Sequence, residues 1–270
     1  MGTAVARHNL LAELRVGIAR LVTSEAWIEW LKVQRRFHHY SYANTLLILA
    51  QRPDATRVAG YGAWRQLGRQ VRKGEHAIAI LAPLATRSSA VDSLETQPPA
   101  VSGFTVAHVF DIVQTQGVAL PQILLPLEAQ EPHAGFDRMG LVARSLGYQV
   151  ARANTGNAFG DCDPVRHSIR VRPDLSDAQA LKTLTHEVAH GLLHANMDVP
   201  REIAELEAES VAYVVCGELG LDTSAYSFGY VTVWAGGGEA ALAALATSAQ
   251  RIQKAAVRIL ERVQERGRAL

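Results

Sequence analysis

The chain has 270 residues, 48% of them hydrophobic and 20% charged, with a formal net charge of +1. This is the composition of an ordinary globular protein, and the length is enough for two domains. No apolar run reaches the roughly 18 residues that a membrane span requires, so we expect no membrane association.

Two features bear on the compartment. The two cysteines, Cys162 and Cys216, are too few for a disulfide framework and lack the CxxC spacing of a thiolate metal site. The first twenty residues carry charges through a helical pattern and no compact apolar segment with a cleavage site, so no export signal is expected. We therefore expect a cytoplasmic protein. The oligomeric state stays open.

The small net charge conceals a basic segment. Between residues 32 and 87 there are ten basic residues and two acids, Asp54 and Glu75, so this segment is locally near +8 and the remainder is acidic. Such a basic segment is typical of a surface that meets an acidic partner.

The predicted elements of the first half are helices followed by a hairpin. Helical periodicity runs in two stretches from about residue 10 to residue 50, and a short helix is predicted over 61–67. Residues 76–82 and 104–112 read as strands. The intervening 83–103 is rich in Ser, Pro and small residues and predicts a loop, so we expect the two strands to pair as a β-hairpin.

Three prolines interrupt any regular element near residues 120–132 and mark the expected domain boundary. The predicted domains are therefore 1–125 and 126–270. The second domain is expected to contain, in chain order, a helix at 136–146, strands at 148–153 and 168–172, a helix starting at 176, a helix at 201–219 and an amphipathic helix at 239–269.

The helix expected to begin at Ser176 carries the sequence His186-Glu187-Val188-Ala189-His190. At about 100° per residue the two histidines project from nearly the same face, close enough to share one tetrahedral cation. Glu187 lies beside the first histidine, where it can reach a water on the metal. This pattern predicts a zinc site. The alternative is a helix with surface histidine and glutamate side chains.

Zinc hydrolases of the His₂Glu kind take a third ligand from a second helix downstream, and the helix at 201–219 offers three glutamates. Glu205 and Glu209 share one helical stripe, whereas Glu207 points about 200° away from Glu205. We expect Glu209 to be the ligand. Glu205 is expected to orient a ligand imidazole, and it is the fallback ligand. His194 either extends the histidine row or contacts the last carbonyls of its helix.

With three protein ligands, a fourth position stays open for water, as in catalytic zinc sites. We expect one Zn²⁺ per chain, with Glu187 as the general base in peptide hydrolysis. The strand at 168–171 is expected to be an edge strand that pairs with an extended protein or peptide substrate. Tyr230 is the preferred residue to stabilise the oxyanion, with Tyr226 and His167 as alternatives.

The basic segment interleaves cations with aromatic side chains, the combination that contacts phosphates and stacks on bases of single-stranded nucleic acid. The alternative is a solvated arginine-rich surface with the aromatic residues in the core. The residues expected to bind DNA are Arg35, Arg36, Tyr42, Asn44, Trp64, Arg69, Arg72 and Lys73.

Four segments carry a resemblance to a family. The runs at 44–47, 64–68, 71–75 and 109–115 resemble the N-terminal single-stranded-DNA-binding domain of ArdC-type antirestriction proteins. The second half is similar to the zincin domain of those proteins, and its His186–His194 run also resembles the ImmA/IrrE metallopeptidases. The resemblance follows the family order from about residue 27 to residue 234. A glutamate in a VAE-type segment of the family corresponds to Glu209 and supports it as a ligand.

The expected protein is α+β, with an N-terminal helical and β-hairpin module that binds single-stranded DNA and a C-terminal zincin-like metallopeptidase domain of the gluzincin type. The resemblance implies antirestriction or protection of mobile DNA. Two alternatives remain open: a DNA-binding antirestriction protein whose metal site is structural or dispensable, and an ImmA-like peptidase that cleaves a repressor and uses its basic half to bind protein.

Overall fold

The computed structural model describes residues 2–85, 101–120, 132–222, 228 and 238–267. It is a mixed α and β structure, as predicted, with two compact units. Unit 1 contains Met1–Gly17 and Ala43–Pro121, and unit 2 contains Ile18–Tyr42 and Gln122–Leu270. No helix in the described ranges is both long and apolar enough to cross a bilayer.

Unit 1 is built on an antiparallel sheet with strand order β1-β4-β3. The predicted hairpin strands are β3 (Ile78–Ala85) and β4 (Val101–Asp111), and their antiparallel pairing is confirmed, with Ile78 opposite Val109. The shorter elements of the unit are β1 (Val58–Gly60), α4 (Tyr61–Gln66), β2 (Arg69–Val71), the 3₁₀ helix η1 (Ile112–Gln114) and β5 (Thr115–Gly117). The predicted loop at 83–103 falls partly within the β3 and β4 strands and otherwise outside the described residues.

The core of unit 1 lies where two helices cover one face of this sheet. Leu10 of α1 (Gly2–Arg20), Leu47 of α3 (Tyr42–Gln51) and Leu81 of β3 form a buried cluster. Asn44 joins α3 to the same strand, because its amide donates to the Leu81 carbonyl and accepts from the Leu81 N–H, each at 2.9 Å. A side chain that satisfies both backbone groups of a strand residue holds the helix in register on the sheet.

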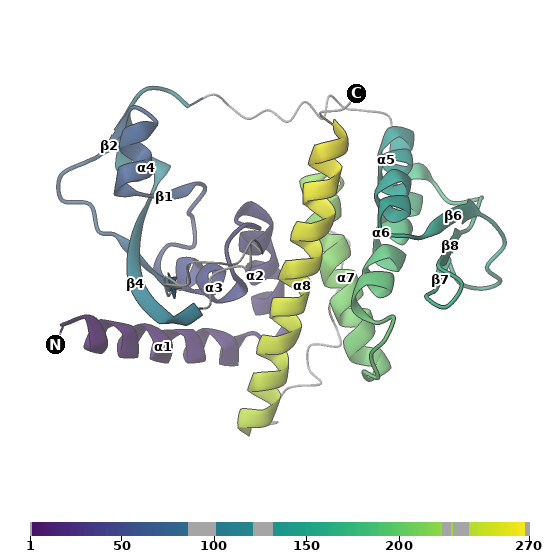
Figure 1. Ribbon diagram of the computed structural model, residues 1–270, viewed down its shortest axis with the longest axis horizontal. Coiled ribbons are helices and arrows are strands. Elements are labelled where there is room, and N and C mark those ends of the chain that lie inside the picture. The colour runs from purple at the N-terminus through teal and green to yellow at the C-terminus, as the bar shows by residue number, and fades with distance from the viewer. Residues whose placement is uncertain (1, 86–100, 121–131, 223–227, 229–237, 268–270) are drawn as a thin grey trace, which may run out of the picture. The chain divides into compact units, whose positions relative to one another are not determined.

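Unit 2 has a small sheet on one side of a central helix and helices on the other (Figure 1). The sheet order is β6-β8-β7, with β6 (Gln149–Arg152) parallel to β8 (Ser168–Val171) and β7 (Gly160–Asp163) antiparallel to β8. The helices are α2 (Ser24–Arg36), α5 (Pro132–Ser145), α6 (Asp177–Leu193), α7 (Arg201–Glu218) and α8 (Gly238–Gly267).

The sheet order corrects one prediction. The strand at 168–171 was expected at an edge, but β8 is the central strand of its sheet, and β7 is an edge strand. Strand β7 was not predicted, because its sequence Gly-Asp-Cys-Asp consists mostly of residues that are depleted in strands. It forms because its backbone pairs with β8, whose Ile169 and Val171 are buried.

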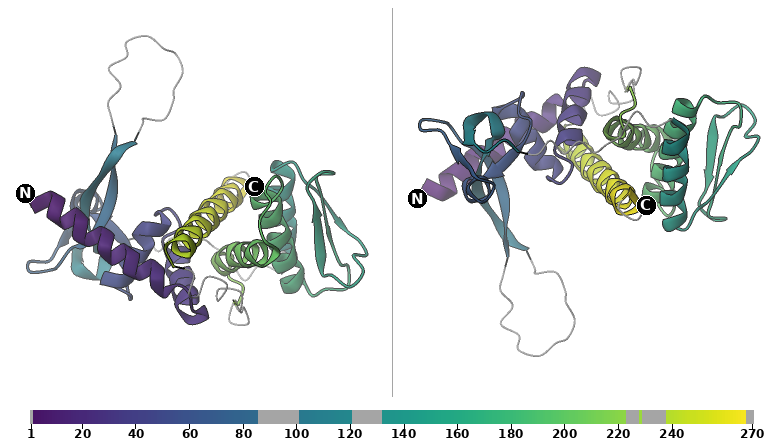
Figure 2. Two further views of the ribbon diagram at one scale, coloured as in Figure 1. Left: turned by 90° about the horizontal axis from the view of Figure 1, so that it is seen from below. Right: turned by 90° about the horizontal axis from the view of Figure 1, so that it is seen from above.

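Helix α8 has the packing role that its apolar periodicity predicted. Leu245, Ile252, Ala256 and Ile259 are completely buried, and the helix contacts α5, α6 and α7 within unit 2. Figure 2 shows α8 alongside α7 in both views. The side chains of α8 therefore reach the back of the two helices that carry the metal-binding pattern.

Helix α2 also packs in unit 2, although the predicted boundary assigned it to the N-terminal domain. Its start is capped by Thr23, whose hydroxyl accepts from the Ala26 N–H at 3.3 Å. Trp27 and Trp30 are completely buried, and the Trp27 indole N–H donates to the Ser210 hydroxyl of α7 at 2.9 Å. Helix α2 is thus a structural part of the unit that contains α7.

We predict that Trp27→Ala lowers the free energy of unfolding by about 3–5 kcal/mol, because it leaves a cavity at a fully buried aromatic side chain. It also removes the donor to the Ser210 hydroxyl. Lys32→Ala, on the exposed face of the same helix, is the control and should change stability by less than about 0.5 kcal/mol. Urea unfolding of the three proteins gives the comparison, and a Trp27→Ala loss as small as the control would contradict this role of α2.

Candidate metal centre

Helix α6 begins where its sequence predicted. The Ser176 hydroxyl accepts a hydrogen bond from the Gln179 N–H at 3.4 Å. Asp177 places a negative charge in the first turn, where it interacts favourably with the positive end of the helix dipole. Leu184 and Val188 are buried against the core of unit 2. This packing fixes the rotation of the helix, so that His186 and His190 face α7.

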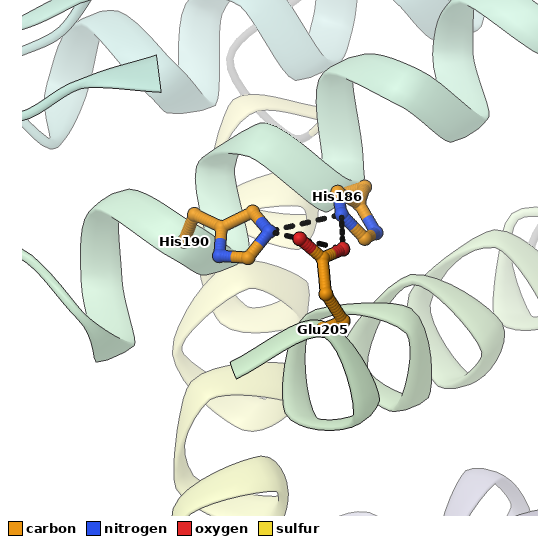
Figure 3. Close-up of side chains that lie close together, drawn as sticks. All are labelled: His186, His190 and Glu205. Atoms are coloured by element: carbon orange, nitrogen blue, oxygen red, sulfur yellow. Dashed lines mark hydrogen bonds and ion pairs between the residues drawn. The ribbon is translucent and has the colours of Figure 1, made fainter. Parts of the chain in front are cut away.

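His186, His190 and Glu205 bring one ligand atom each to a common point (Figure 3). The Nε2 atoms of the histidines are 3.0 Å apart, and Glu205 Oε2 lies 3.4 Å from that of His186 and 3.8 Å from that of His190. A tetrahedral zinc ion with ligand bonds of about 2.0–2.1 Å holds its donor atoms about 3.3 Å apart. The donors therefore fit a small divalent cation in both type and spacing.

Glu209, the expected third ligand, contacts the other ring nitrogen of His186, Nδ1, and not Nε2. Its Oε2 is 3.2 Å from His186 Nδ1, and its Oε1 forms an ion pair with Lys182 Nζ at 2.8 Å. Burial alone would raise the pKa of Glu209, but hydrogen bonds from His186 and Lys182 hold it below its usual value. Lys182, one turn before His186 on α6, was not predicted to take part.

His194 joins His190 to a buried ion pair. His190 Nδ1 is 3.0 Å from His194 Nδ1, and His194 Nε2 is 2.9 Å from Glu207 Oε2. The same oxygen of Glu207 lies 3.1 Å from an Arg251 guanidinium nitrogen. Glu207, which points away from Glu205 on α7, is completely buried between α6 and α8. His194 therefore neither extends the ligand row nor simply caps its helix.

Glu187 has the environment of a general base. The side chain is 9% exposed, and burial is the main cause that raises its pKa above the usual glutamate value, while the nearby histidines act in the opposite direction. Glu187 is not part of the three-residue ligand group. A carboxylate with a raised pKa beside a metal site is suited to accept a proton from water and to release it again.

A cleft of about 470 Å³ opens onto the cluster. Its walls combine the metal-facing residues with the edge strand β7 and the start of α7. The lining residues are Ala158, Gly160, Asp161, Cys162, Pro164, His186, Glu187, His190, His194, Ala195, Arg201 and Glu205. The cleft is large enough to hold several residues of an extended peptide beside β7.

Gly160 allows β7 to approach α6 closely. A β-carbon at this position would lie 2.6 Å from a Thr183 methyl group and 3.1 Å from Glu187 Cγ. Any larger residue would therefore push the strand away from Glu187. The close approach places the backbone of β7 next to Glu187.

Cys162 lines the cleft but is not a thiolate in the metal-free protein. Burial and the negative charge of Glu187 raise the pKa of its thiol to about 12. Since only the thiolate is a strong zinc ligand, the histidines and Glu205 are the better donor set.

The expected oxyanion residue, Tyr230, lies outside the described residues, as does the alternative Tyr226. His167 is described, and its ring lies against Tyr148 with centroids 5.5 Å apart, away from the cleft lining. Among the described lining residues, Arg201 supplies a permanent positive charge, 3.8 Å from Glu205 Oε1. Nothing in the local sequence pattern distinguished Arg201 from other surface arginines.

Two residues of the expected DNA-binding set have structural roles instead. Trp64 is 2% exposed and donates its indole N–H to the Phe110 carbonyl at 2.9 Å, so it has no free face for a base. Asn44 is buried in its contacts with β3. A tryptophan or asparagine beside cations in the sequence looks the same whether it is buried or exposed.

The remaining members of the set differ in exposure. Arg69 donates to Thr115 and to the Val118 carbonyl, and Arg72 pairs with Glu75 at 2.9 Å, so both also hold local structure. Arg35 and Tyr42 are half-buried, whereas Arg36 and Lys73 are exposed. Arg35, Arg36 and Tyr42 belong to unit 2 and the others to unit 1.

The fold and the cluster describe a mixed α and β protein with a His-His-Glu group of metal-binding type. Residues 12–108 match the family model for the N-terminal domain of the anti-restriction factor ArdC. This match agrees with the resemblance to ArdC-type proteins that the same part of the sequence carries. The matched range includes α2, which packs in unit 2.

The chain is similar to a curated protein and to solved structures of an ArdC protein. An uncharacterized protein of Bacillus anthracis is 26% identical over an alignment of 260 positions. The alignment covers 80% of this chain and 44% of that protein. The Mn(II)-bound crystal structure of the antirestriction ArdC protein from plasmid R388 is 21% identical, covers 87% of this chain and 97% of that one, and has a TM-score of 0.49. Its metal-free structure is 20% identical, with coverage of 83% and 84% and a TM-score of 0.48.

The charge on His186 leads to a prediction about metal binding and pH. Burial opposes its protonation, but the carboxylates of Glu205 and Glu209 outweigh that effect and raise the pKa of His186 to about 9. A metal ion must displace this proton, so the apparent affinity should increase by about tenfold per pH unit as the pH rises toward 9. Calorimetry in buffers of different ionisation enthalpy should detect about one proton released per ion at neutral pH. Binding without proton release would contradict the protonated state of His186.

Proposed function

We propose that unit 2 is a zincin-type metallopeptidase domain that binds one Zn²⁺ through His186, His190 and Glu205 and uses Glu187 as its general base. The observation that carries this proposal is the side of the cluster that the described residues leave open. Three donors converge on one point next to a buried glutamate that is not a ligand, and a cleft leads to that point. A structural zinc site would be closed by a fourth protein ligand.

The choice of Glu205 over Glu209 follows from the two nitrogens of His186. Glu205 faces Nε2 of both histidines, whereas Glu209 contacts Nδ1 of His186 and is held there by Lys182. A carboxylate that accepts from Nδ1–H leaves Nε2 free for the metal, which is the usual role of a residue behind a ligand histidine. In this proposal the two glutamates exchange the roles that were expected from the sequence.

The bound ion would polarise a carbonyl group and make a water more acidic. The residues of the chain supply the remaining chemistry of peptide hydrolysis. Glu187 accepts the proton of the attacking water and returns it to the leaving amine. The exposed edge of β7 pairs with the backbone of an extended peptide, and Gly160 keeps this edge within reach of Glu187.

The N-terminal domain is proposed to bind single-stranded DNA, as its family suggests. The exposed cations Arg36 and Lys73 are the members of the expected set that are best placed for phosphate contacts. DNA binding would hold the peptidase near protein substrates that act on DNA, consistent with an antirestriction role. The competing function is DNA-binding antirestriction with a dispensable metal site.

We predict that Glu187→Gln lowers the rate of peptide cleavage by about 10²–10⁴-fold, because the amide cannot accept the proton of water. Its zinc content should remain one per chain, since Glu187 is not a ligand. His186→Ala should lose both zinc and cleavage. The measurement is cleavage of a diverse mixture of unstructured peptides, followed by mass spectrometry, together with metal analysis. Cleavage by Glu187→Gln at the wild-type rate would exclude this mechanism.

The DNA-binding proposal predicts an affinity that falls with ionic strength. For single strands, the slope of log K against log salt decreases by about 0.7 for each phosphate contact that is removed. Arg36→Ala combined with Lys73→Ala should reduce the slope, whereas Arg258→Ala, which removes an exposed cation of α8, should not. Fluorescence anisotropy with a labelled oligonucleotide provides the data. A flat salt response of the wild-type protein would rule out phosphate contacts.

A further inference from the structure

A chain of hydrogen-bonding groups extends from the metal face into the interior of unit 2. It runs from His190 Nδ1 to His194 Nδ1 at 3.0 Å, and from His194 Nε2 to Glu207 Oε2 at 2.9 Å. Arg251 of α8 closes it with an ion pair to Glu207 Oε2 at 3.1 Å. Arg251 also donates to the Leu193 carbonyl at 2.7 Å, which ties the end of α6 to α8.

We propose that Glu207 and Arg251, acting through His194, are positioning residues that hold His190 in the tautomer required for metal binding. This inference rests on the proposed metal site. It concerns the back of that site, where none of these three residues touches the ion.

The direction of each hydrogen bond follows from its charged end. The Glu207 carboxylate can only accept, so His194 Nε2 carries the proton of that bond. The Nδ1 atom of a neutral His194 is then an acceptor, and His190 Nδ1 must be the donor. His190 Nε2 is left without a proton and faces Glu205 and His186. One buried negative charge thereby sets the tautomers of two imidazoles in series.

Each of the two ligand histidines is oriented by a carboxylate, directly for His186 and through His194 for His190. His186 contacts a carboxylate directly, because Glu209 lies at Nδ1 with its charge balanced by Lys182. His190 lies farther along α6, and His194 spans the distance to Glu207, whose charge is balanced by Arg251. Each imidazole is thus backed by a carboxylate and each carboxylate by a cation.

The burial of Glu207 argues against a role in stability alone. Its side chain is completely buried, and its Oε1 has no hydrogen-bond partner among the described residues. A buried carboxylate with an unsatisfied oxygen costs free energy, and well-packed apolar residues often replace buried ion pairs without loss of stability. Orientation of His194 accounts for a charge at this position, whereas packing does not.

The test measures the His190 tautomer and the zinc affinity separately, in the full-length protein. Nitrogen chemical shifts of His190 in the zinc-free protein report which ring nitrogen carries the proton. The wild type should show His190 protonated at Nδ1. Glu207→Gln should populate the other tautomer and weaken zinc binding by about 10–100-fold in a chelator competition assay. Glu202→Gln, an exposed glutamate on the same helix, is the matched control and should change neither quantity.

A second variant distinguishes loss of the positioning role from a folding defect. Arg251→Gln keeps the Glu207 carboxylate but removes its cation, and it should produce a smaller change of the same kind. Circular dichroism verifies that each variant is folded. If Glu207→Gln and Arg251→Gln are folded and retain both the wild-type tautomer and the wild-type zinc affinity, the positioning role is refuted. If the wild type binds no zinc while the Nδ1 tautomer still depends on Glu207, the proposed function fails and the tautomer control stands.

Discussion

The packing of α6 against α7 is the contact on which the candidate metal centre depends, because these two helices supply the donor atoms of the His-His-Glu group. Leu184 and Val188 of α6 and Leu206 and Val211 of α7 are buried in the same unit. Their burial fixes the rotation of both helices and sets His186 and His190 opposite Glu205 and Glu209. A small rotation of either helix would separate Nε2 from Glu205 by more than a metal ion can bridge.

This packing places charged and polar groups within a low-dielectric interior, where unpaired charges are costly. Compensation occurs in pairs: Lys182 with Glu209, and Arg251 with Glu207. Glu187 differs, because burial is the main cause that raises its pKa and because it lies at the cleft beside the histidines of the cluster. The surroundings thus differ among carboxylates that are chemically alike in the sequence, and these differences support the separate roles proposed for them.

The sequence was sufficient where a feature depends on one element or on neighbouring elements. The four-residue spacing of His186 and His190 follows from helix geometry alone, as does the capping of α6 by Ser176. The β3 and β4 pairing was predicted from alternation. The sequence was insufficient where two helices meet. Glu205 and Glu209 share a stripe of α7, and only the register against α6 decides which one faces Nε2.

Longer-range contacts left no local signal at all. Arg251 reaches Glu207 from a helix that begins at residue 238, so no spacing rule connects them. Strand β7 is stabilised by pairing with β8 and not by its own composition. The buried indole of Trp64 donates to the Phe110 carbonyl, 46 residues further along the chain. These features required the tertiary structure.

The most direct test of the account is the coordination of the bound ion, determined from anomalous scattering in crystals of the zinc-loaded protein. We expect one zinc ion bonded to His186 Nε2, His190 Nε2 and a Glu205 oxygen, with Glu209 still in contact with His186 Nδ1. A zinc ion bonded to Glu209 in place of Glu205, or four protein ligands that leave no open position toward the cleft, would contradict it.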